Sequence, residues 1–464
     1  MSTSSVLQQA AQSILSGVTN SQLDVNTLVS ALVTGATAAQ STTIATAQSS
    51  DNTQLSALGS LQSAMTNLQS SLAGLSDGSI FTQLSATMSG TGITATTSTG
   101  AAAGSYSVSV QQIATANQIS SKAYATNATL GTGNLNISVG STSMTIALTS
   151  SNNTLSGIAS AINSASNNPG VTASVVTGTD GQHLVLTSTQ TGAANTVTVS
   201  ADPTVDAGMA TANFTQVTAG QDAKLTISGT SVVSASNNVT SALSGVTLSL
   251  TSASVGTTQT LAVATNTSSI VTAIGNFATA YNSWVSTVKS LTSYNSTSNS
   301  AGPLLGDAMT NSAVNGISSI MASGVVVGGT TYSLAQLGVD LNDDGTVTFT
   351  SSTLQSTLAA TPSLVSNTFN GTNGIGEQLT AFISSYTTAV TGQFAQREAT
   401  LQSDLTAQQA ALTSLSAYQA TLTSQYQAQF TQLNTIMSQT QSNTSYLNQL
   451  FGGNGAAGTL NKTA

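Results

Sequence analysis

LSALGSLQSAMTNLQSSL, residues 55–72, carries an apolar side chain at every seventh position, since Leu58, Met65 and Leu72 alternate with Leu61 and Leu68. This spacing predicts a helix that buries one apolar stripe along the length of a partner helix. We expect the helix to cover residues 42–76. It should end at the turn sequence Ser76-Asp77-Gly78.

A second apolar repeat of the same kind lies near the other end of the chain. It predicts a helix over residues 394–440, separated from the preceding helix by Gly392 and on the order of 70 Å long at 1.5 Å per residue. Gln408, Gln419 and Gln429 stand where the repeat requires an apolar residue. The stripe itself consists of Leu401, Leu405, Leu412, Leu415, Leu422, Tyr426, Leu433 and Ile436.

The simplest partner for this long helix is the N-terminal helix of the same chain. Their antiparallel pairing would bring both chain ends together and place the middle of the chain at the far end. The sequence therefore predicts an α+β multidomain protein. A long antiparallel coiled-coil stem is formed by both chain ends, and a distal β-rich head of two domains is inserted between them.

The middle of the chain changes from helical to alternating periodicity between residues 80 and 265, as in Tyr106-Ser107-Val108-Ser109-Val110. One helix, Leu155–Ala165, interrupts these strands. Helical spacing resumes in residues 266–300. Further helices are expected at 307–322 and 352–369, with a hairpin centred on Asn342-Asp343-Asp344-Gly345 between them.

These patterns divide the chain into five predicted segments. They are residues 1–41, a terminal helical segment that is disordered until assembly; 42–77 with 266–440, the helical stem; 78–125 with 215–265, a β-rich head domain; 126–214, an outer head domain; and 441–464, a C-terminal terminal segment.

Composition excludes several classes of function. Only 4% of the 464 residues are charged, against roughly 25% in ordinary soluble proteins. The five basic residues stand singly, so there is no patch that could neutralise phosphates, and nucleic acid is not an expected partner. There is no cysteine, which excludes disulfides and thiolate metal sites. The bases are Lys122, Lys224, Lys289, Arg397 and Lys462.

The chain shows no sign of membrane insertion or of a cleaved secretory signal. Its first twenty residues contain no Lys or Arg ahead of a weakly apolar portion. Ser, Thr, Gln or Asn interrupts every apolar run before it reaches about 18 residues. We therefore expect no membrane association, and export through a dedicated channel.

Two motifs resemble ligand-binding sequences, but each lacks a residue or an element that such a site requires. Asp340, Asn342, Asp344 and Gly345 match the first half of a calcium loop, but the twelfth position is Ser351, where a bidentate Glu is required. A hairpin turn is the better interpretation. A dinucleotide-type glycine pattern, Gly453, Gly455 and Gly458, has no preceding strand and no following helix, so we interpret it as a tail.

Catalytic constellations are also missing. His183 is the only histidine and lies in a strand pattern, where an ordinary sheet position is the better interpretation. Glu377 and Glu398 are the only glutamates, and both fall on stem helices. Trp284 lies on an amphipathic helix and is expected in a core. We predict no catalytic residue, no metal and no cofactor.

Several motifs, taken in order along the chain, resemble one family. LDVNTLVSALV (23–33), LSALGSLQSAMTNLQSSL (55–72) and GSYSVSVQQIATANQISSKAY (104–124) are similar to the N-terminal signature, first stem helix and head-opening strand of the flagellar filament cap (flagellar hook-associated protein 2) family. Residues 134–193 resemble the flagellin-type insertion module, here within the outer head domain. SNNVTSALSGVTLSL (236–250), GPLLGDAMTNSAVNGI, LGVDLNDDGTVTF and YQAQFTQLNTIMSQTQSNTSYLNQLF resemble its head-closing and C-terminal segments.

This resemblance implies a structural protein that makes and breaks no bond. It would be exported through the flagellar type III channel, form a ring of about five copies at the filament tip, hold flagellin in the filament and guide its folding and insertion. The implied partners are the chain itself, flagellin, the hook-filament junction protein, and the export chaperone and apparatus. Asn20-Ser21-Gln22 departs from the family's usual Gly-Ser-Gly.

Two other functions remain open at this point: a flagellin-like or hook-filament junction subunit, and a surface adhesin that uses the exposed head. The LLGD and LGVDLNDDG segments followed by SYLNQLF resemble the cap family and not flagellin. In each case we expect the apolar stripes to mediate stem packing and assembly. An Asp at Leu405 or Leu412 should place an unpaired charge in a desolvated seam. The expected packing residues are Leu58, Leu61, Met65, Leu68, Leu72, Leu401, Leu405, Leu412, Leu415, Leu422, Tyr426 and Leu433.

Overall fold

The computed structural model describes residues 25–327 and 329–451. They fold into two compact units. A helical unit combines the chain up to Gly78 with the chain from Val271 onward, and a β-rich unit, Ser79–Ile270, is inserted between these parts in the sequence. The predicted fold class, with both chain ends forming one helical part and a β-rich part between them, is confirmed.

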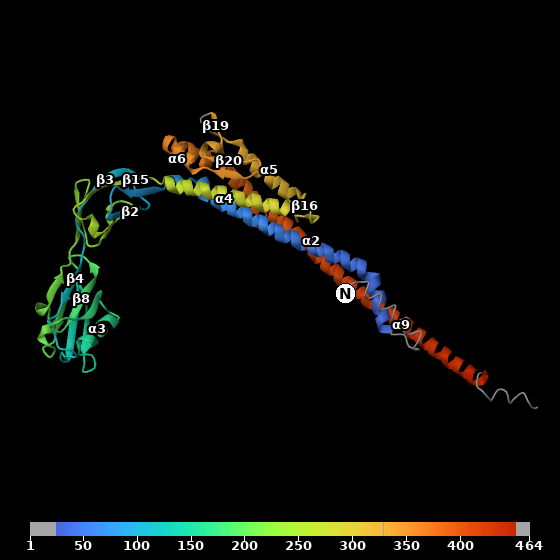
Figure 1. Cartoon of the computed structure of the whole chain (residues 1–464), viewed down its shortest axis with the longest axis horizontal. Coiled ribbons are helices and arrows are strands. Elements are labelled where there is room, and N and C mark those ends of the chain that lie inside the picture. Colours follow the sequence, from blue (N-terminus) through green and yellow to red (C-terminus); the bar gives the residue numbers. More distant parts are fainter. Residues whose placement is uncertain (1–24, 328, 452–464) are drawn as a thin grey trace, which may run out of the picture. The chain divides into compact units, whose positions relative to one another are not determined.

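Two long helices dominate the helical unit. Helix α2 (Val25–Ser76) and helix α9 (Gln393–Phe451) run side by side (Figure 1). Their contacts progress in opposite directions along the two helices, so the pair is antiparallel. Both helices are longer than the sequence predicted, because α2 begins at Val25 and α9 continues to Phe451. The parts of the two terminal segments before residue 25 and after residue 451 lie outside the described residues.

Shorter helices complete the core of this unit. They pack around five large side chains that are at most 1% exposed: Phe277, Tyr281, Trp284, Phe369 and Phe394. The rings of Phe277 and Phe369 meet edge to face with centroids 5.9 Å apart. The expectation that Trp284 lies in a core is therefore confirmed. The helices are α4 (Thr267–Thr292), α5 (Ala308–Ser323), α6 (Ser351–Ala360), α7 (Pro362–Asn370) and α8 (Ile375–Thr387).

The single helix predicted over residues 352–369 is wrong. It is two helices, α6 and α7, that meet at Thr361 and Pro362. Proline has no N–H to donate and its ring disfavours helical backbone in the residue before it, so Thr361 adopts φ −146°. Pro362 instead begins α7, a position that it tolerates well.

Short antiparallel pairs connect the helices of this unit. The predicted hairpin at Asn342–Gly345 is confirmed, because β20 (Val339–Leu341) pairs with β21 (Val347–Phe349). The other two pairs are β16 (Tyr294–Asn295) with β17 (Ser300–Ala301) and β18 (Val325–Val327) with β19 (Thr330–Tyr332).

The β-rich unit contains two hydrophobic cores. One lies between a sheet of order β10-β4-β8-β7, a sheet of order β6-β5-β9 and the single helix α3 (Leu155–Ser164), whose Thr154 caps the N–H of Gly157. Helix α3 confirms the predicted helix at residues 155–165. The strands are β4 (Ala116–Ser120), β5 (Gly133–Val139), β6 (Thr142–Leu148), β7 (Val171–Thr177), β8 (Gln182–Thr191), β9 (Val197–Ala201) and β10 (Thr215–Thr218).

The second core lies between a sheet of order β1-β15-β3-β11-β12 and a sheet of order β13-β14-β2. Alternate residues of β3, such as Val108 and Val110, point into this core, as the period-two pattern predicted. The strands are β1 (Leu84–Met88), β2 (Ile93–Thr97), β3 (Gly104–Gln112), β11 (Ala223–Ile227), β12 (Thr230–Ser234), β13 (Asn238–Leu243), β14 (Val246–Leu250) and β15 (Thr258–Thr265).

Strand pairing places two strands differently from the predicted boundaries of the outer head domain, residues 126–214. Strand β4 lies before residue 126 and β10 after residue 214, yet β4 pairs with both β8 and β10. Ile119 of β4 is 5% exposed in the same core as α3. The physical reason is that both strands complete one sheet, a long-range pairing that alternation along the chain does not reveal.

We predict that Leu68→Ala lowers the free energy of unfolding of the helical unit by about 2–5 kcal/mol, because Leu68 is fully buried and the deletion leaves a cavity. Trp284, the only tryptophan of the chain, reports on this unit, so urea unfolding followed by its fluorescence measures the effect. Thr66→Ala, on the exposed side of the same helix, is the control, with an expected change of at most about 0.5 kcal/mol. Equal midpoints for both variants would contradict the core assignment.

Candidate functional site

The predicted packing residues of α2 all lie in the interior of the helical unit. Leu58, Leu61, Met65, Leu68 and Leu72 are each 0% exposed. The pairs α2–α9 and α2–α8 make the most extensive helix contacts of the unit. These five side chains are therefore buried within one copy of the chain. They are not available to a neighbouring molecule.

The predicted packing residues of α9 differ in burial, and those after Leu415 are more exposed than Leu415 itself. Leu401 and Leu415 are buried, and Leu433 is 42% exposed. Phe430 packs against Leu28 and Ala31, close to the first described residue of α2, so Leu433 lies beyond the described contact with that helix. The intermediate positions, all half-buried, are Leu405, Leu412, Leu422 and Tyr426.

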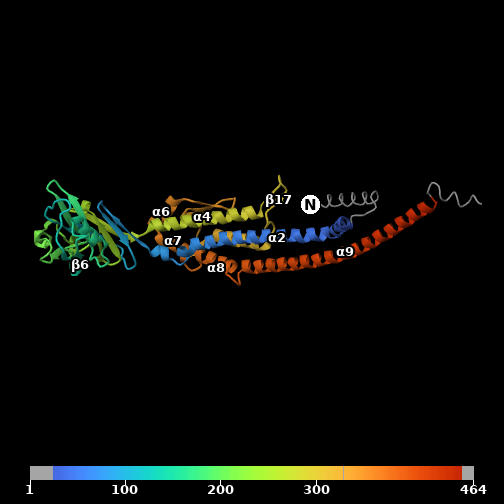
Figure 2. The same cartoon turned by 90° about the horizontal axis from the view of Figure 1, so that it is seen from below.

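The last turns of α9 carry an apolar surface that nothing among the described residues covers. Figure 2 shows α9 continuing past the described start of α2. We call this set of side chains the terminal apolar surface. Its members, between 42% and 63% exposed, are Leu433, Ile436, Tyr446, Leu447 and Leu450.

Sequence reasoning missed the last three of these residues, although a signal was present. Leu447 and Leu450 continue the 3-4 spacing of Leu433 and Ile436, with Thr440 and Asn443 at the two positions between. The polar residues at those two positions interrupt the apolar stripe after Ile436. The pattern up to that point does not show that the stripe resumes at Leu447.

Polar side chains connect α2 to α9 at the positions where the apolar repeat fails. Gln408 donates its Nε2 hydrogen to Asp51 Oδ2 at 2.6 Å, and Gln419 donates to Thr37 Oγ1 at 2.8 Å. Arg397 adds a hydrogen bond to Gln54 Oε1 at 3.2 Å. Such polar contacts within an apolar seam specify the alignment of two helices at a cost in stability.

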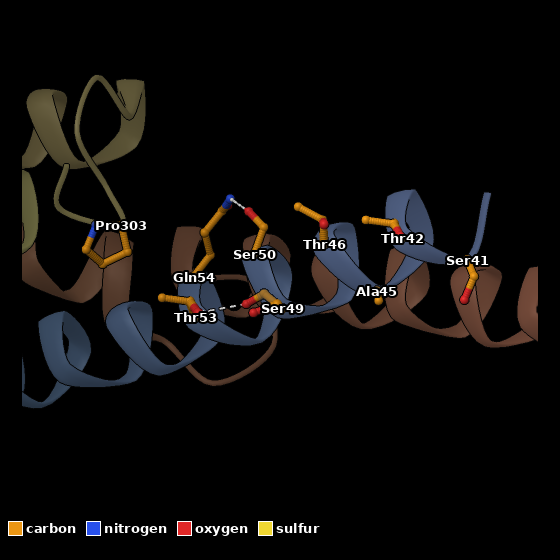
Figure 3. A pocket seen from close by; sticks show the side chains of 9 residues that line it. All are labelled: Ser41, Thr42, Ala45, Thr46, Ser49, Ser50, Thr53, Gln54 and Pro303. Atoms are coloured by element: carbon orange, nitrogen blue, oxygen red, sulfur yellow. Dashed lines mark hydrogen bonds between the residues drawn. The ribbon is translucent and has the colours of Figure 1, made fainter. Parts of the chain in front are cut away.

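A shallow groove runs along the outer side of α2, where Pro303 forms one wall (Figure 3). Its lining contains hydroxyls, methyl groups and one amide, but no charged or aromatic side chain. Such a surface has no group for acid-base chemistry or for metal binding. The lining residues are Ser41, Thr42, Ala45, Thr46, Ser49, Ser50, Thr53, Gln54 and Pro303.

The calcium-like sequence folds as the tip of the β20–β21 hairpin. Asp344 accepts hydrogen bonds from the backbone and hydroxyl of Thr346 and forms an ion pair with Lys289 at 3.2 Å. These bonds, led by the Thr346 hydroxyl, lower the pKa of Asp344 to about 2. Ser351, the twelfth position of the motif, already belongs to α6. Within residues 25–327 and 329–451, no group of three or more acidic or histidine side chains could hold a metal ion.

The two glutamates and the C-terminal glycine pattern are the next features singled out by the sequence. Glu377 accepts a hydrogen bond from the backbone of Asn373 in the first turn of α8, and Glu398 lies on α9, so both glutamates do fall on helices of this unit. The glycine pattern at Gly453, Gly455 and Gly458 lies outside the described residues.

The β-rich unit gathers some of the chain's few charges at one point. Lys122 lies 3.1 Å from Asp206, whose Oδ1 also accepts a hydrogen bond from the hydroxyl of Tyr124 at 2.9 Å. Burial alone would raise the pKa of Asp206, but the bonds from the Gly208 N–H, Tyr124 and Lys122 outweigh it and lower that pKa. Burial and the same carboxylate raise the pKa of Tyr124. The group ties the segment after β4 to the loop after β9.

His183 holds two neighbouring segments of the same unit. Its Nδ1 lies 2.8 Å from the Ser121 carbonyl oxygen and its Nε2 lies 3.1 Å from Asp180 Oδ1. Both acceptors favour the charged imidazolium, and the Ser121 contact contributes most to the raised pKa of His183. No nucleophile accompanies it in these contacts. The position is that of a strand residue, as the sequence predicted.

Models of known protein families match the two terminal parts of this chain and a segment of the β-rich unit between them. Residues 21–117 match the flagellar hook-associated protein 2 N-terminus, residues 220–442 match its C-terminus, and residues 134–190 match the flagellin hook IN motif. The chain is 34% identical over 465 residues to flagellar hook-associated protein 2 of Escherichia coli K12, covering 94% of this chain and 97% of that one. This chain belongs to the flagellar hook-associated protein 2 family.

Two further comparisons agree. The B-type flagellar hook-associated protein 2 of Pseudomonas aeruginosa is 39% identical over 173 residues, which cover 36% of each chain. The crystal structure of the D1, D2 and D3 domains of the flagellar cap protein FliD from Escherichia coli superposes with a TM-score of 0.56. It is 31% identical and covers 74% of this chain and 99% of that one.

As a member of this family, the chain is a flagellar cap protein that works outside the cell at the filament tip. The family is structural and not a family of enzymes. Among the described residues, no helix has both the length and the apolar character needed to cross a membrane.

We predict that His183 makes the β-rich unit more stable in mild acid. Because its pKa is raised in the folded chain, its contribution is complete below the unfolded value of about 6.5 and is lost as the pH rises through the folded value. Hydrogen exchange of the β8 amides, corrected for intrinsic rates, should show more protection at pH 5.5 than at pH 8.

His183→Gln should remove this pH dependence, and Asp180→Asn should reduce it while the contact with Ser121 remains. An unchanged difference between the two pH values in His183→Gln would show that another group is responsible.

Proposed function

We propose that this chain caps the flagellar filament as a closed ring of copies, about five as the family resemblance implies, joined through the helical stem. The observation that carries the proposal is the terminal apolar surface. It consists of large apolar side chains on the last turns of α9, in the same 3-4 spacing by which α9 packs on α2. Helices that carry such a stripe associate with other helices.

Composition supports association between like copies. With 4% charged residues and a net charge of −9 spread over 464 residues, neighbouring stems repel one another little. Head-to-tail contacts between identical copies close into a ring when the rotation between neighbours allows it, which limits the assembly to a defined size.

The proposed work of the ring involves three kinds of partner. Flagellin would be retained and guided into place beneath the ring, the hook-filament junction protein would provide the first attachment, and the export chaperone and apparatus would deliver the unfolded chain. The stem, residues 42–77 with 266–440, would hold the ring together. Of the two terminal segments, residues 25–41 and 441–451 are already helical in the single copy. Assembly would bury the apolar side chains that residues 441–451 leave exposed.

The alternatives receive less support. We would not expect a flagellin-like or junction subunit to match both the N-terminal and the C-terminal family models of flagellar hook-associated protein 2. Nor would we expect it to align with one such protein over 94% of this chain. Adhesion through the β-rich unit has no specific observation in its favour, since the charged groups with unusual contacts there pair within the unit, Asp206 with Lys122 and His183 with Asp180.

The structure refines the expected effect of charges in the seam. Leu405 and Leu412 are half-buried, so an Asp at either position would remain partly hydrated and cost less than full desolvation. Leu415 is 4% exposed and is the better site for a test of the intramolecular seam. Leu433, on the terminal apolar surface, tests contacts between copies.

We predict that Leu433→Asp leaves the helical unit folded but abolishes the oligomer and swimming, because the side chain is exposed in one copy and buried in the ring. Leu415→Asp should instead destabilise the fold by several kcal/mol, since its charge is buried without a partner. Native mass spectrometry and swimming of cells that lack their own cap protein measure these effects.

His183→Ala and Asp344→Ala serve as controls and should swim normally, because their contacts lie away from the seam. Swimming of Leu433→Asp together with loss of swimming in either control would mean that function resides in another part of the molecule.

A further inference from the structure

Helix α2 contains two interior glycines that packing does not explain. A Cβ added at Gly35 or Gly59 would meet no atom within 4 Å, and neither residue has the positive φ that favours glycine. Glycine inside a helix is less favourable than alanine because it loses more backbone freedom on folding. Two such glycines in one helix lower its stability, and no close contact in the folded copy requires them.

Helix α2 begins at Val25, so Gly35 lies in its N-terminal part. The ribbon of α2 turns near its N-terminal end (Figure 1). Sharp bends in helices arise at proline, at glycine and serine, or where a side chain enters the hydrogen-bond ladder. Helix α2 contains no proline, and its N-terminal part contains both Gly35 and Thr37, whose hydroxyl donates a hydrogen bond to the Val33 carbonyl at 2.8 Å.

Burial falls between the two glycines. Thr37 and Ala57 are buried, yet none of residues 38–56, all of which are described, is buried. By contrast, the half of α2 from Ala57 to Leu75 is the centre of the helical core. Few tertiary contacts therefore resist a change of shape between the glycines.

Side chains in this part of α2 also compete for the helix backbone. Hydroxyls bond to the carbonyl four residues earlier, a contact that weakens and bends helices. The Gly59 carbonyl itself accepts such a bond from Ser63 at 2.8 Å. Further bonds of this kind run from Thr37 to Val33, Thr43 to Ala39, Thr53 to Ser49, Ser56 to Asn52 and Ser60 to Ser56. Ser70 makes one such bond, to Thr66, in the half of α2 that forms the helical core.

The contacts from this part of α2 to α9 include three side-chain hydrogen bonds, Gln408 to Asp51, Gln419 to Thr37 and Arg397 to Gln54. The long Gln side chains can keep such bonds through small displacements, unlike a close-packed core, which has few voids. The groove in Figure 3 is lined mainly by residues of the same section of α2. Their side chains are short and leave the outer side of the helix open.

We infer that residues 35–56 of α2 form a compliant section, in which the helix bends between the rigid core around Leu58–Leu75 and its N-terminal end. Gly59 lies at the edge of that core. This inference rests on the proposed function, because a ring that guides each flagellin into place beneath it would need stems that change shape. The glycines, the back-bonding hydroxyls and the polar contacts act together, each lowering the resistance to bending.

The bending is measured by double electron–electron resonance between two spin labels on the full-length protein. The chain has no cysteine, so Ser30→Cys and Thr66→Cys, both exposed on α2, accept spin labels without background. We expect a broad distribution of separations. In Gly35→Ala/Gly59→Ala the distribution should narrow and shift toward about 54 Å, the length of 36 residues of straight helix.

Thermal unfolding provides a second measure, since each Gly→Ala should raise Tm by roughly 2–4 °C. Ser70→Ala is the matched control: it also raises helix propensity at an exposed position, but within the rigid half of α2. It should leave the distance distribution unchanged. Identical distributions in the wild type and in the double alanine variant would overturn the compliant section.

Swimming decides whether the compliance is used. In cells that lack their own cap protein, the wild-type chain and Ser70→Ala should restore swimming and the double alanine variant should restore less, although it is more stable. Full swimming by the stiffened variant would overturn the inference and leave the proposed function intact. Failure of the wild-type chain itself would overturn the proposed function.

Discussion

The antiparallel contact between α2 and α9 is the constraint on which the helical unit depends. Neither helix could be stable alone in water, since each is rich in Ser, Thr and Gln and most helical stability in proteins comes from packing of an apolar face. Their pairing joins residues more than 300 positions apart, as in the hydrogen bonds from Arg397 to Gln54 and from Gln408 to Asp51. The β-rich unit can be inserted between them because the two chain ends already hold the helical unit together.

The contact changes in character along its length, and this gradient relates fold to function. Around Leu68 it is a close-packed core with α8. Near Asp51 it becomes a mixed seam with amide hydrogen bonds, and beyond Phe430 α9 has no described partner. One pair of helices therefore provides rigidity at one end and, as we propose, a bendable section in the middle and an association surface at the other end.

Much of this organisation could be predicted from sequence, and the misses have physical causes. Heptad spacing identified Leu58–Leu72 because a stripe with this period has to be buried. It could not show that Leu433 is exposed among the described residues, because the periodicity of one helix does not reveal how far its partner accompanies it. The helix over 352–369 ignored the local signal of Pro362. The places of β4 and β10 depended on long-range strand pairing, which no local pattern contains.

Negative-stain electron microscopy of the purified protein tests the central claim most directly, since it shows what the stems build. We expect closed rings of uniform size, single or stacked in pairs. Long filaments would indicate a flagellin-like subunit, and monomers at high concentration would show that the terminal apolar surface does not join copies; either result would contradict the account.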